Sequence, residues 1–321
     1  MINFIMNEII RKNYVFGMIS KINIKLLITL ICFAFLGNSI YGNFDSLSNQ
    51  TITSEQILWI LWGGIFSFFS IIINAYAWKL LINNIGCSIN NLNIIQLFLA
   101  TNIYKYLPGG IWHFVSRYKN LRLELSNEKS IESILLEPIL MLVAGFIFIP
   151  FRGFNLPIYI LCWSSTLLFL PTFRQSLIKK LRTMKAKVFT NNDNIKDRDL
   201  AENIQNISTS FFYPYKPLFV EIIFIFFRFI GFLCCVNAFS IGSLISHGEL
   251  ISSFSLAWII GLIVPAAPGG LGVFESVILF SLSSHLPEAP LLASLLCYRL
   301  VSTVSDILAA LIYPVKKIFK V

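Results

Sequence analysis

Long apolar runs separated by short polar segments make up most of this chain. A helix needs about 20 apolar residues to cross the hydrocarbon core of a bilayer. Six runs come close to or exceed that length: 24–42, 56–82, 131–150, 155–172, 216–241 and 289–314. Two further apolar stretches, 91–118 and 250–283, contain helix-breaking residues. The pattern predicts an all-α polytopic membrane protein with these eight apolar segments in a single integral membrane domain, residues 1–321.

The two interrupted stretches carry the same tripeptide, Pro-Gly-Gly, at 108–110 and 268–270. Matching residues follow the two copies at the same spacing: Phe114 with Phe274, and Ser116 with Ser276. Proline lacks a backbone N–H and glycine loses much conformational entropy in a helix, so each tripeptide ends a helix. Backbone left unpaired at membrane depth is tolerated only where protein or a water-filled cavity covers it. Paired breaks in the two halves of a chain point to a transporter-type binding site.

The positions of Lys and Arg indicate how the segments lie in the membrane, because cytoplasmic loops are enriched in them. Basic clusters lie in 11–25, 119–129, 173–215 and 316–320, whereas the loops 43–55, 242–249 and 284–288 have no Lys or Arg. If both interrupted stretches turn back, every basic cluster is cytoplasmic, and Arg152 in a short outer turn is the one exception.

We therefore predict six full transmembrane helices and two re-entrant hairpins inserted from opposite faces, as in inverted repeats. The N- and C-termini and the basic loop 173–215 are expected in the cytoplasm, and the protein in the cell (plasma or inner) membrane.

Composition supports a membrane protein. The chain is 56% hydrophobic and 13% charged with a mean hydropathy of +0.74, whereas soluble domains carry about 25% charged residues. The net charge of +9 does not indicate nucleic-acid binding, since the basic residues gather between apolar runs. The basic N-terminal segment precedes an apolar run without a small-residue cleavage site, so we expect a retained span and not a removed signal peptide.

The helices that begin at the two tripeptides are candidates for anion binding. Gly109, Gly110, Gly269 and Gly270 would lie at helix N-termini, where free N–H groups and the positive end of the helix dipole attract anions. Two such tips meeting from opposite sides would form a mid-membrane anion site. The alternative is a pair of tight turns that only closes the helix packing.

Charged residues within apolar segments cost at least about 2.5 kcal/mol each, so they are functional candidates. Those at membrane depth complete the candidate site: Lys105, Arg117, Arg228, Glu275, Arg299 and Asp306. From a rise of about 1.5 Å per residue, we expect Glu275 to engage Arg228 or Arg299, and Asp306 to engage Arg117. The alternatives are snorkelling for Lys105 and Arg117, and structural ion pairing for Arg228 and Arg299.

The same depth estimate argues against one further pairing and places two more acidic residues outside the site. The aligned motifs suggest a direct pair of Arg117 with Glu275. If the two tips meet end to end, however, these residues are about 20 Å apart, so we do not expect this pair. Glu137 and Glu221 are expected near the cytoplasmic face, outside the site.

Nothing in the sequence predicts catalysis. His113, His247 and His285 are too scattered for a metal or catalytic cluster, and no Ser/His/Asp set or Asp-rich metal motif is present. The GGLG run at 269–272 follows no predicted strand, so it is not a nucleotide fingerprint. We expect no enzyme activity, cofactor, metal or nucleic-acid partner.

The segments KYLPGGIWHFVSR (105–117) and PAAPGGLGVFES (265–276) resemble the lysylphosphatidylglycerol synthase transmembrane-region family, the flippase-type membrane domains of multiple peptide resistance factors and their stand-alone relatives. The resemblance covers nearly the whole chain and implies handling of an anionic or aminoacylated phospholipid or a lipid-linked headgroup. The family's motifs carry over to Pro108, Gly109, Gly110 and Arg117, and to Pro268, Gly269, Gly270, Gly272 and Glu275. Full-length resistance factors add a soluble synthetase domain after the membrane part, and this chain stops at Val321, so lipid aminoacylation is not expected.

Three hypotheses for function follow. The first is a lipid translocase without its own ATPase, with the headgroup between the hairpin tips and the acyl tails in lipid. The second is an accessory protein that presents a polyprenyl-phosphate or lipid substrate to a partner glycosyltransferase or synthetase. The third is a structural or regulatory membrane protein without transport activity.

Overall fold

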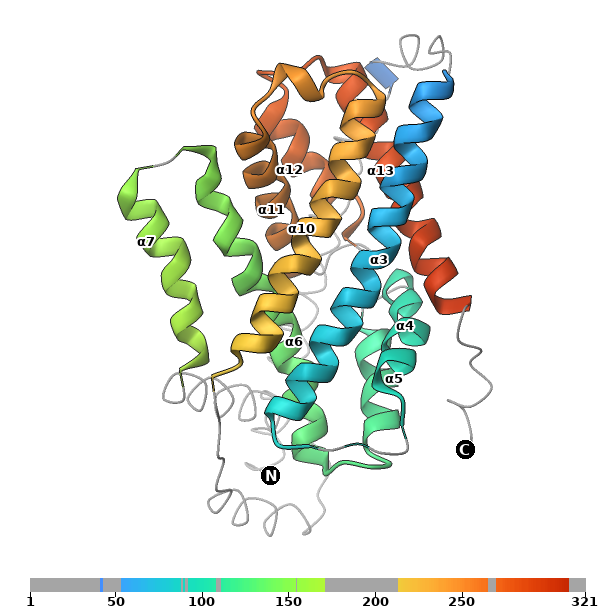
Figure 1. Ribbon diagram of the computed structural model, residues 1–321, viewed down its shortest axis with the longest axis vertical. Helices are drawn as coiled ribbons and strands as arrows, with labels where there is room; N and C mark the ends of the chain where they lie inside the picture. Colours follow the sequence, from blue (N-terminus) through green and yellow to red (C-terminus); the bar gives the residue numbers. More distant parts are fainter. Residues whose placement is uncertain are drawn as a thin grey trace, which may run out of the picture.

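The computed structural model describes residues 41–42, 53–87, 89, 92–107, 111–153, 155–170, 213–264 and 270–311. Within these ranges all regular secondary structure is helical (Figure 1). The α-helices are α3 (Ser54–Asn84), α4 (Ile94–Asn102), α5 (Trp112–Leu121), α6 (Asn127–Phe148), α7 (Leu156–Ser164), α10 (Tyr215–Ala238), α11 (His247–Ile263), α12 (Val273–Leu282) and α13 (Glu288–Leu311). The 3-10 helices are η1 (Ile103–Tyr106), η2 (Ile149–Arg152), η3 (Ser165–Phe169) and η5 (Gly242–Leu244).

Four helical segments are long and apolar enough to cross a bilayer: α3, Asn127–Arg152, α10 and α13. They confirm the predicted runs 56–82, 131–150, 216–241 and 289–314. The predicted run 155–172 is represented by the shorter apolar segment Leu156–Phe169. The predicted run 24–42, apart from its last two residues, and nearly all of the basic loop 173–215 lie outside the described residues, as do both chain ends.

Helix starts follow local capping signals. Thr53 caps α3 in a reciprocal arrangement with Gln56, and the side chain of Ser126 accepts the N–H of Lys129 at the start of α6. Such side-chain oxygens satisfy N–H groups that have no partner within the helix. In α6 the cap places the helix start at Asn127, four residues before the predicted apolar run.

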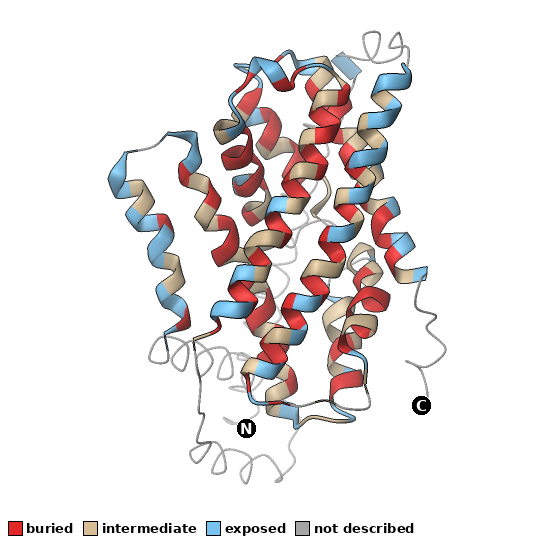
Figure 2. Cartoon of the chain, in the orientation of Figure 1, coloured by how far each residue is buried: buried red, intermediate tan, exposed pale blue. Residues whose placement is uncertain are grey.

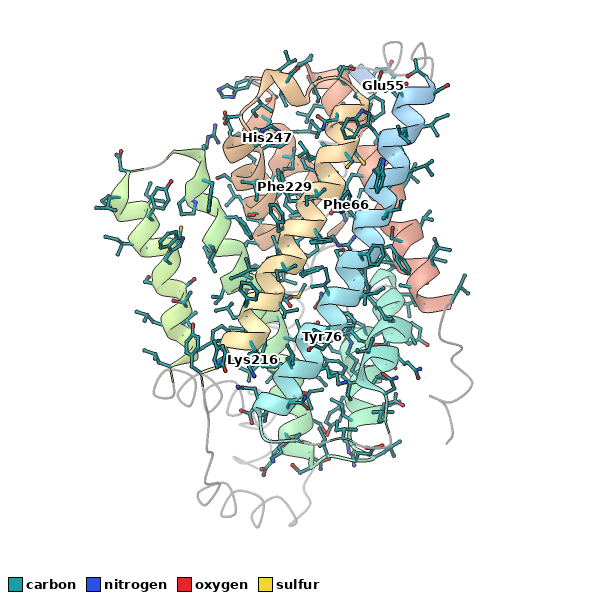
Figure 3. The ribbon with its side chains drawn as sticks, in the orientation of Figure 1. Glu55, Phe66, Tyr76, Lys216, Phe229 and His247 are labelled. Carbon is teal, nitrogen blue, oxygen red and sulfur yellow. The ribbon has the colours of Figure 1, made fainter. Side chains whose placement is uncertain are left out.

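α3 and α10 pack side by side and antiparallel. Figure 3 shows Glu55 of α3 at the upper end and Lys216 of α10 at the lower end. A Cβ added to Gly63 would lie 3.1 Å from the carbonyl oxygen of Gly231, and one added to Gly231 would lie 2.5 Å from Ser67 Oγ. Small residues therefore let the two backbones approach closely, as in other helix pairs within membranes.

The two interrupted stretches each form a pair of short helices, so the predicted breaks are confirmed. α4, η1 and α5 occupy the lower half of the molecule, and α11 and α12 the upper half (Figure 1). At the second break, Gly270 and Gly272 have φ of 69° and 84°, a conformation that favours glycine. The tripeptide 108–110 and residues 265–269 lie outside the described residues, and with them Gly109, Gly110 and Gly269.

Burial follows the arrangement of a helical membrane protein. The helix faces that meet at the centre are buried, whereas the outward faces of α3, α7 and α13 are exposed (Figure 2). Many of these exposed side chains are large and apolar, among them Leu61, Trp62, Ile160, Leu161 and Leu300. Apolar outer faces suit lipid contact, and the chain is a multi-pass helical membrane protein.

Candidate functional site

A cavity of about 260 Å³ lies between the two interrupted stretches. The first stretch contributes residues of α4, η1 and α5 to its wall, and the second contributes residues of α11 and α12. Phe114 and Phe274, which occupy matching positions after the two tripeptides, both line it. The remaining wall comes from α3, α6, α10 and α13, so long helices hold both breaks around one space.

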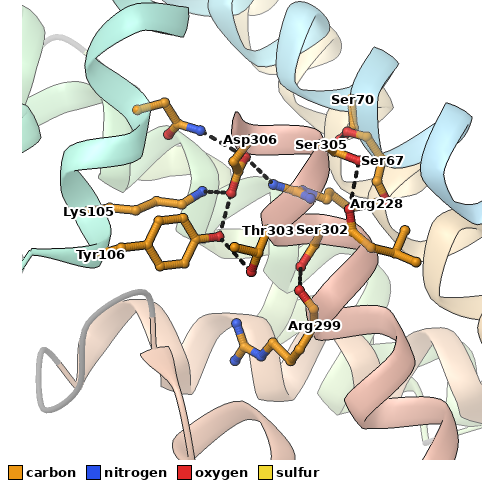
Figure 4. A network of polar contacts seen from close by, with 12 residues as sticks. Ser67, Ser70, Lys105, Tyr106, Arg228, Arg299, Ser302, Thr303, Ser305 and Asp306 are labelled. Carbon is orange, nitrogen blue, oxygen red and sulfur yellow. Dashed lines mark hydrogen bonds and ion pairs between the residues drawn. The ribbon is translucent and has the colours of Figure 1, made fainter. Parts of the chain in front are cut away.

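Asp306 of α13 is the centre of the polar contacts in this cavity (Figure 4). Lys105 Nζ lies 2.7 Å from its Oδ2, and Arg228 Nη2 lies 3.3 Å from its Oδ1. The Tyr106 hydroxyl donates to Oδ2 at 2.6 Å, and Asn102 Nδ2 donates to Oδ1 at 3.0 Å. The side chain of Asp306 is fully buried, so its charge depends on these donors. One carboxylate thus joins the first interrupted stretch to α10 and α13.

The cluster around Asp306 has more basic than acidic groups, because Lys105 and Arg228 both contact this one carboxylate. Within the described residues, Nε and Nη1 of Arg228 have no hydrogen-bond partner, although both are buried. The guanidinium lies over the face of Trp258, with 5.8 Å between its Cζ and the ring centroid. Arg228 lines the cavity. It therefore presents unpaired donors and unneutralised charge at a site where an anion would satisfy both.

The second interrupted stretch is held by Arg299. Its Nε binds the Glu275 carboxylate, and its Nη2 donates to the Gly270 carbonyl oxygen at 3.0 Å. The expected pair of Glu275 with Arg299 is therefore confirmed, and the alternative pairing of Glu275 with Arg228 is wrong. Glu275 also accepts the Gly272 N–H at 2.8 Å. Gly272 is the N-cap residue of α12, so a carboxylate of the helix itself lies at its N-terminus.

Arg117 pairs with Glu137, and the expected pair of Arg117 with Asp306 is wrong. Arg117 Nη1 lies 2.7 Å from Glu137 Oε2, and its Nε donates to Thr101 Oγ1 at 3.2 Å. Its Cζ lies 3.8 Å from the ring centroid of Phe98 and stacks there as a cation–π contact. Arg117 is 1% exposed, so it does not snorkel to a membrane surface.

One acidic residue on α6 differs from the sequence prediction. Glu137 was expected outside the site, but it is buried and lines the cavity. The apolar runs could not indicate this, because the contact of Glu137 with Arg117 depends on how α5 packs against α6. Glu221 of α10 is 1% exposed, and it is not among the residues that line the cavity.

Several residues of the site could not be predicted from the pattern of charged residues. Asn102, Tyr106 and Trp258 are uncharged, so a search for intramembrane charges passes over them. Asn102 and Tyr106 are four residues apart and flank Lys105, and that spacing was the available clue, because residues three and four apart share a helix face. Of the predicted residues that the structure describes, all line the cavity except Glu275, which reaches it through Arg299: Lys105, Arg117, Arg228, Gly270, Arg299 and Asp306.

Metal binding and the relationship to known proteins both bear on the nature of this site. Among the described residues, no group of three or more His, Cys, Asp or Glu side chains could hold a metal ion. The profile of the family described as "Lysylphosphatidylglycerol synthase TM region" matches residues 22–310, nearly the whole chain. No curated protein matches the chain.

Proposed function

Because the chain belongs to the lysylphosphatidylglycerol synthase transmembrane-region family, we propose that it is a lipid translocase that receives an anionic headgroup in its central cavity. The acyl tails remain in the surrounding lipid while the headgroup passes the two breaks. The observation that carries the proposal is Arg228, with two buried N–H-bearing nitrogens unpaired beside a cluster that has more cations than carboxylates.

The charge balance of the cavity favours a singly negative headgroup. The Arg117–Glu137 and Arg299–Glu275 pairs are each neutral, so the surplus comes from Lys105 and Arg228 around Asp306. An unneutralised charge at membrane depth is costly, and a phosphodiester anion would remove that cost. An aminoacylated headgroup brings cationic amines that the same cluster would repel, so among the lipid classes the family suggests we favour the anionic one.

The size of the cavity supports a headgroup and not a whole lipid. Ligand pockets commonly measure about 300–1,000 Å³, and this one measures about 260 Å³. Ile111 lines the cavity beside the first break and is 54% exposed. An opening at this point would let the tails stay outside while the headgroup enters.

We also propose that the two pairs of short helices, α4–α5 and α11–α12, are re-entrant hairpins inserted from opposite faces. Each helix in these pairs has fewer residues than the roughly 20 needed to span. The two pairs lie in opposite halves of the molecule (Figure 1). Lys119 lies in the last turn of α5 and Lys129 near the start of α6, and both helices reach the lower part of Figure 1. We therefore expect this end to be cytoplasmic by the positive-inside rule, together with the termini and the loop 173–215, in the cell membrane.

Reconstituted vesicles with headgroup-labelled phosphatidylglycerol test the proposal. The wild-type protein is expected to move label between leaflets, and Arg228→Gln to lower the rate by about tenfold or more, because a hydrogen bond to a charged group contributes about 1.5–3 kcal/mol. The introduced amide can still donate to Asp306, and Lys105 still balances that carboxylate, so the variant is expected to fold. Lys216→Gln is the matched control, since it removes an exposed basic side chain from the same helix.

The outcomes separate the hypotheses. A wild-type rate in a stably folded Arg228→Gln protein would overturn the role of the cavity cation. Binding of labelled lipid without movement between leaflets would contradict translocation and favour an accessory protein that presents the lipid to a partner enzyme.

A further inference from the structure

Among the described residues, four that line the central cavity carry buried polar atoms without a hydrogen-bond partner. The atoms are Nε and Nη1 of Arg228, Nε1 of Trp258, Oδ1 of Asn74 and Nδ1 of His113. The proposed function accounts for Arg228 alone. A buried polar atom without a partner costs free energy, so four such residues around one cavity indicate a ligand that supplies several partners.

Arg228 and Trp258 form the part of the cavity wall that only donates. The guanidinium lies over the indole, with 5.8 Å between Cζ and the ring centroid. Phe224 of α10 packs edge-on against the same indole, with 5.6 Å between the ring centroids. Neither a guanidinium nor an indole has an acceptor atom. The unpaired N–H groups of these two residues therefore suit the oxygens of a phosphodiester.

Asn74 of α3 and His113 of α5 lie at one level of the molecule. Below them, the Arg117 guanidinium stacks on two rings, with its Cζ 5.1 Å from the centroid of Trp78 and 3.8 Å from that of Phe98. α3 and α5 run in the same direction (Figure 1). Asn74 precedes Trp78 by four residues and His113 precedes Arg117 by four, so each lies one helical turn from this stack on the same face of its helix. His113 is the second residue of α5, so this turn is the one nearer the first break.

Asn102 of α4 connects this level to the cations of the cavity. It lies one turn along α4 from the same stack, on the side of Asn74 and His113. Its Nδ2 donates to Asp306 Oδ1 at 3.0 Å, and the same oxygen lies 3.3 Å from Arg228 Nη2. One bound headgroup can therefore contact Arg228 with its anionic part and Asn74 and His113 with the remainder.

The unpaired atoms of Asn74 and His113 require a different partner from those of Arg228. The Oδ1 atom of Asn74 accepts hydrogen bonds, and a neutral imidazole has one accepting nitrogen. The oxygen of a phosphodiester anion has no proton to donate. A hydroxyl group both donates and accepts, so headgroup hydroxyls satisfy Asn74 and also His113, whichever of its nitrogens carries the proton.

We propose that the cavity selects a headgroup in which a phosphodiester carries free hydroxyl groups. This inference rests on the proposed function: the phosphodiester binds Arg228 and Trp258, and the hydroxyls bind Asn74 and His113. The latter two are then specificity-determining residues for a polyol or sugar headgroup. A phosphodiester with an alkyl headgroup leaves both of their polar atoms unpaired, and a site that hydrogen-bonds a hydroxyl discriminates against an analogue that lacks it.

Two lipids that differ in these hydroxyls alone test the selection: phosphatidylglycerol and phosphatidylpropanol, each labelled on one acyl chain so that the headgroup is native. Translocation of each lipid is measured in reconstituted vesicles. The wild-type protein is expected to move phosphatidylglycerol about tenfold faster, because its hydroxyls pair with buried groups. A polyprenyl phosphoglucose labelled on its prenyl chain carries the same chemistry. If it moves faster than phosphatidylglycerol, the hydroxyl selection serves a lipid-linked sugar.

Variants of the two residues locate the selection. Asn74→Leu and His113→Phe replace each polar side chain by an apolar one of similar size. Each is expected to lower the ratio of the phosphatidylglycerol rate to the phosphatidylpropanol rate by about threefold, and the double variant is expected to abolish the preference. Both changes remove buried polar atoms that have no partner, which favours folding. The ratio compares two lipids in one protein sample, so a smaller folded fraction does not alter it.

Asn83→Leu is the matched control, because it makes the same substitution at an exposed position of α3 that does not line the central cavity. It is expected to keep the wild-type ratio. A wild-type protein that moves none of the lipids contradicts the proposed function itself. Movement of phosphatidylglycerol and phosphatidylpropanol at equal rates overturns the hydroxyl selection alone, since buried water would then satisfy these atoms. A wild-type ratio in the double variant overturns the assignment to Asn74 and His113.

Discussion

Asp306 is the single residue on which the central charges depend. It accepts from Lys105, Arg228, Tyr106 and Asn102, and it is fully buried. Removal of one partner from a buried ion pair is costly, because it leaves the other charge without compensation. The same carboxylate therefore holds the first interrupted stretch against α10 and α13 and sets how much positive charge remains for an anion.

Asp306→Asn removes this carboxylate with little change in shape. We expect a loss of unfolding free energy of about 3–5 kcal/mol, since Lys105 and Arg228 would both be uncompensated. Thermal unfolding in detergent measures it. Added phosphate is expected to recover part of the loss, because a ligand that binds only the folded state stabilises it. An Asp306→Asn protein as stable as wild type would contradict this role.

The control for this change is Glu249→Gln. It also removes a carboxylate from an ion pair, but that pair with Arg152 is partly exposed. Exposed pairs contribute about 0–1 kcal/mol, so we expect little change and no response to phosphate.

At the scale of elements, the two interrupted stretches decide the architecture. Each consists of two short helices that leave and return to the same half of the molecule (Figure 1). If they are re-entrant, the segments on either side of each stretch lie on the same side of the membrane. If they cross, those segments lie on opposite sides.

Labelling of single introduced cysteines from each side of the membrane tests this arrangement, in a protein whose six native cysteines are replaced. The exposed positions Asn83 and Leu123 flank the first stretch, and the exposed positions Ser243 and Ser284 flank the second. We expect the first two to react from the cytoplasmic side and the last two from the other side. Reaction of Asn83 and Leu123 from opposite sides would contradict a re-entrant first hairpin.

The elements were largely predictable from the sequence, and the pairing of charges was only partly so. Length and apolar content define α3, α10 and α13, and Pro-Gly-Gly defines the breaks, because both signals are local. The pairing of Arg117 with Glu137 was missed because it depends on how α5 packs against α6. Contacts between distant helices depend on depth and rotation, which apolar runs alone do not define.

At the scale of the whole molecule, four helical segments long enough to span surround a cavity that both interrupted stretches line. The wall combines apolar side chains, among them Phe114, Phe274 and Trp258, with charged ones such as Lys105 and Arg228. A headgroup in this space would contact both halves of the chain at once. A headgroup can follow this path only if the cavity is open.

Translocation of headgroup-labelled phosphatidylglycerol by a cavity-filled variant tests that requirement most directly. Gly261 of α11 lines the cavity, and a Cβ added there would have no atom of the described residues within 4 Å, so the side chain of Gly261→Phe is expected to occupy part of the cavity. We expect an unchanged unfolding temperature and translocation reduced to the rate of protein-free vesicles. Translocation at the wild-type rate by a folded Gly261→Phe protein would contradict a headgroup path through this cavity.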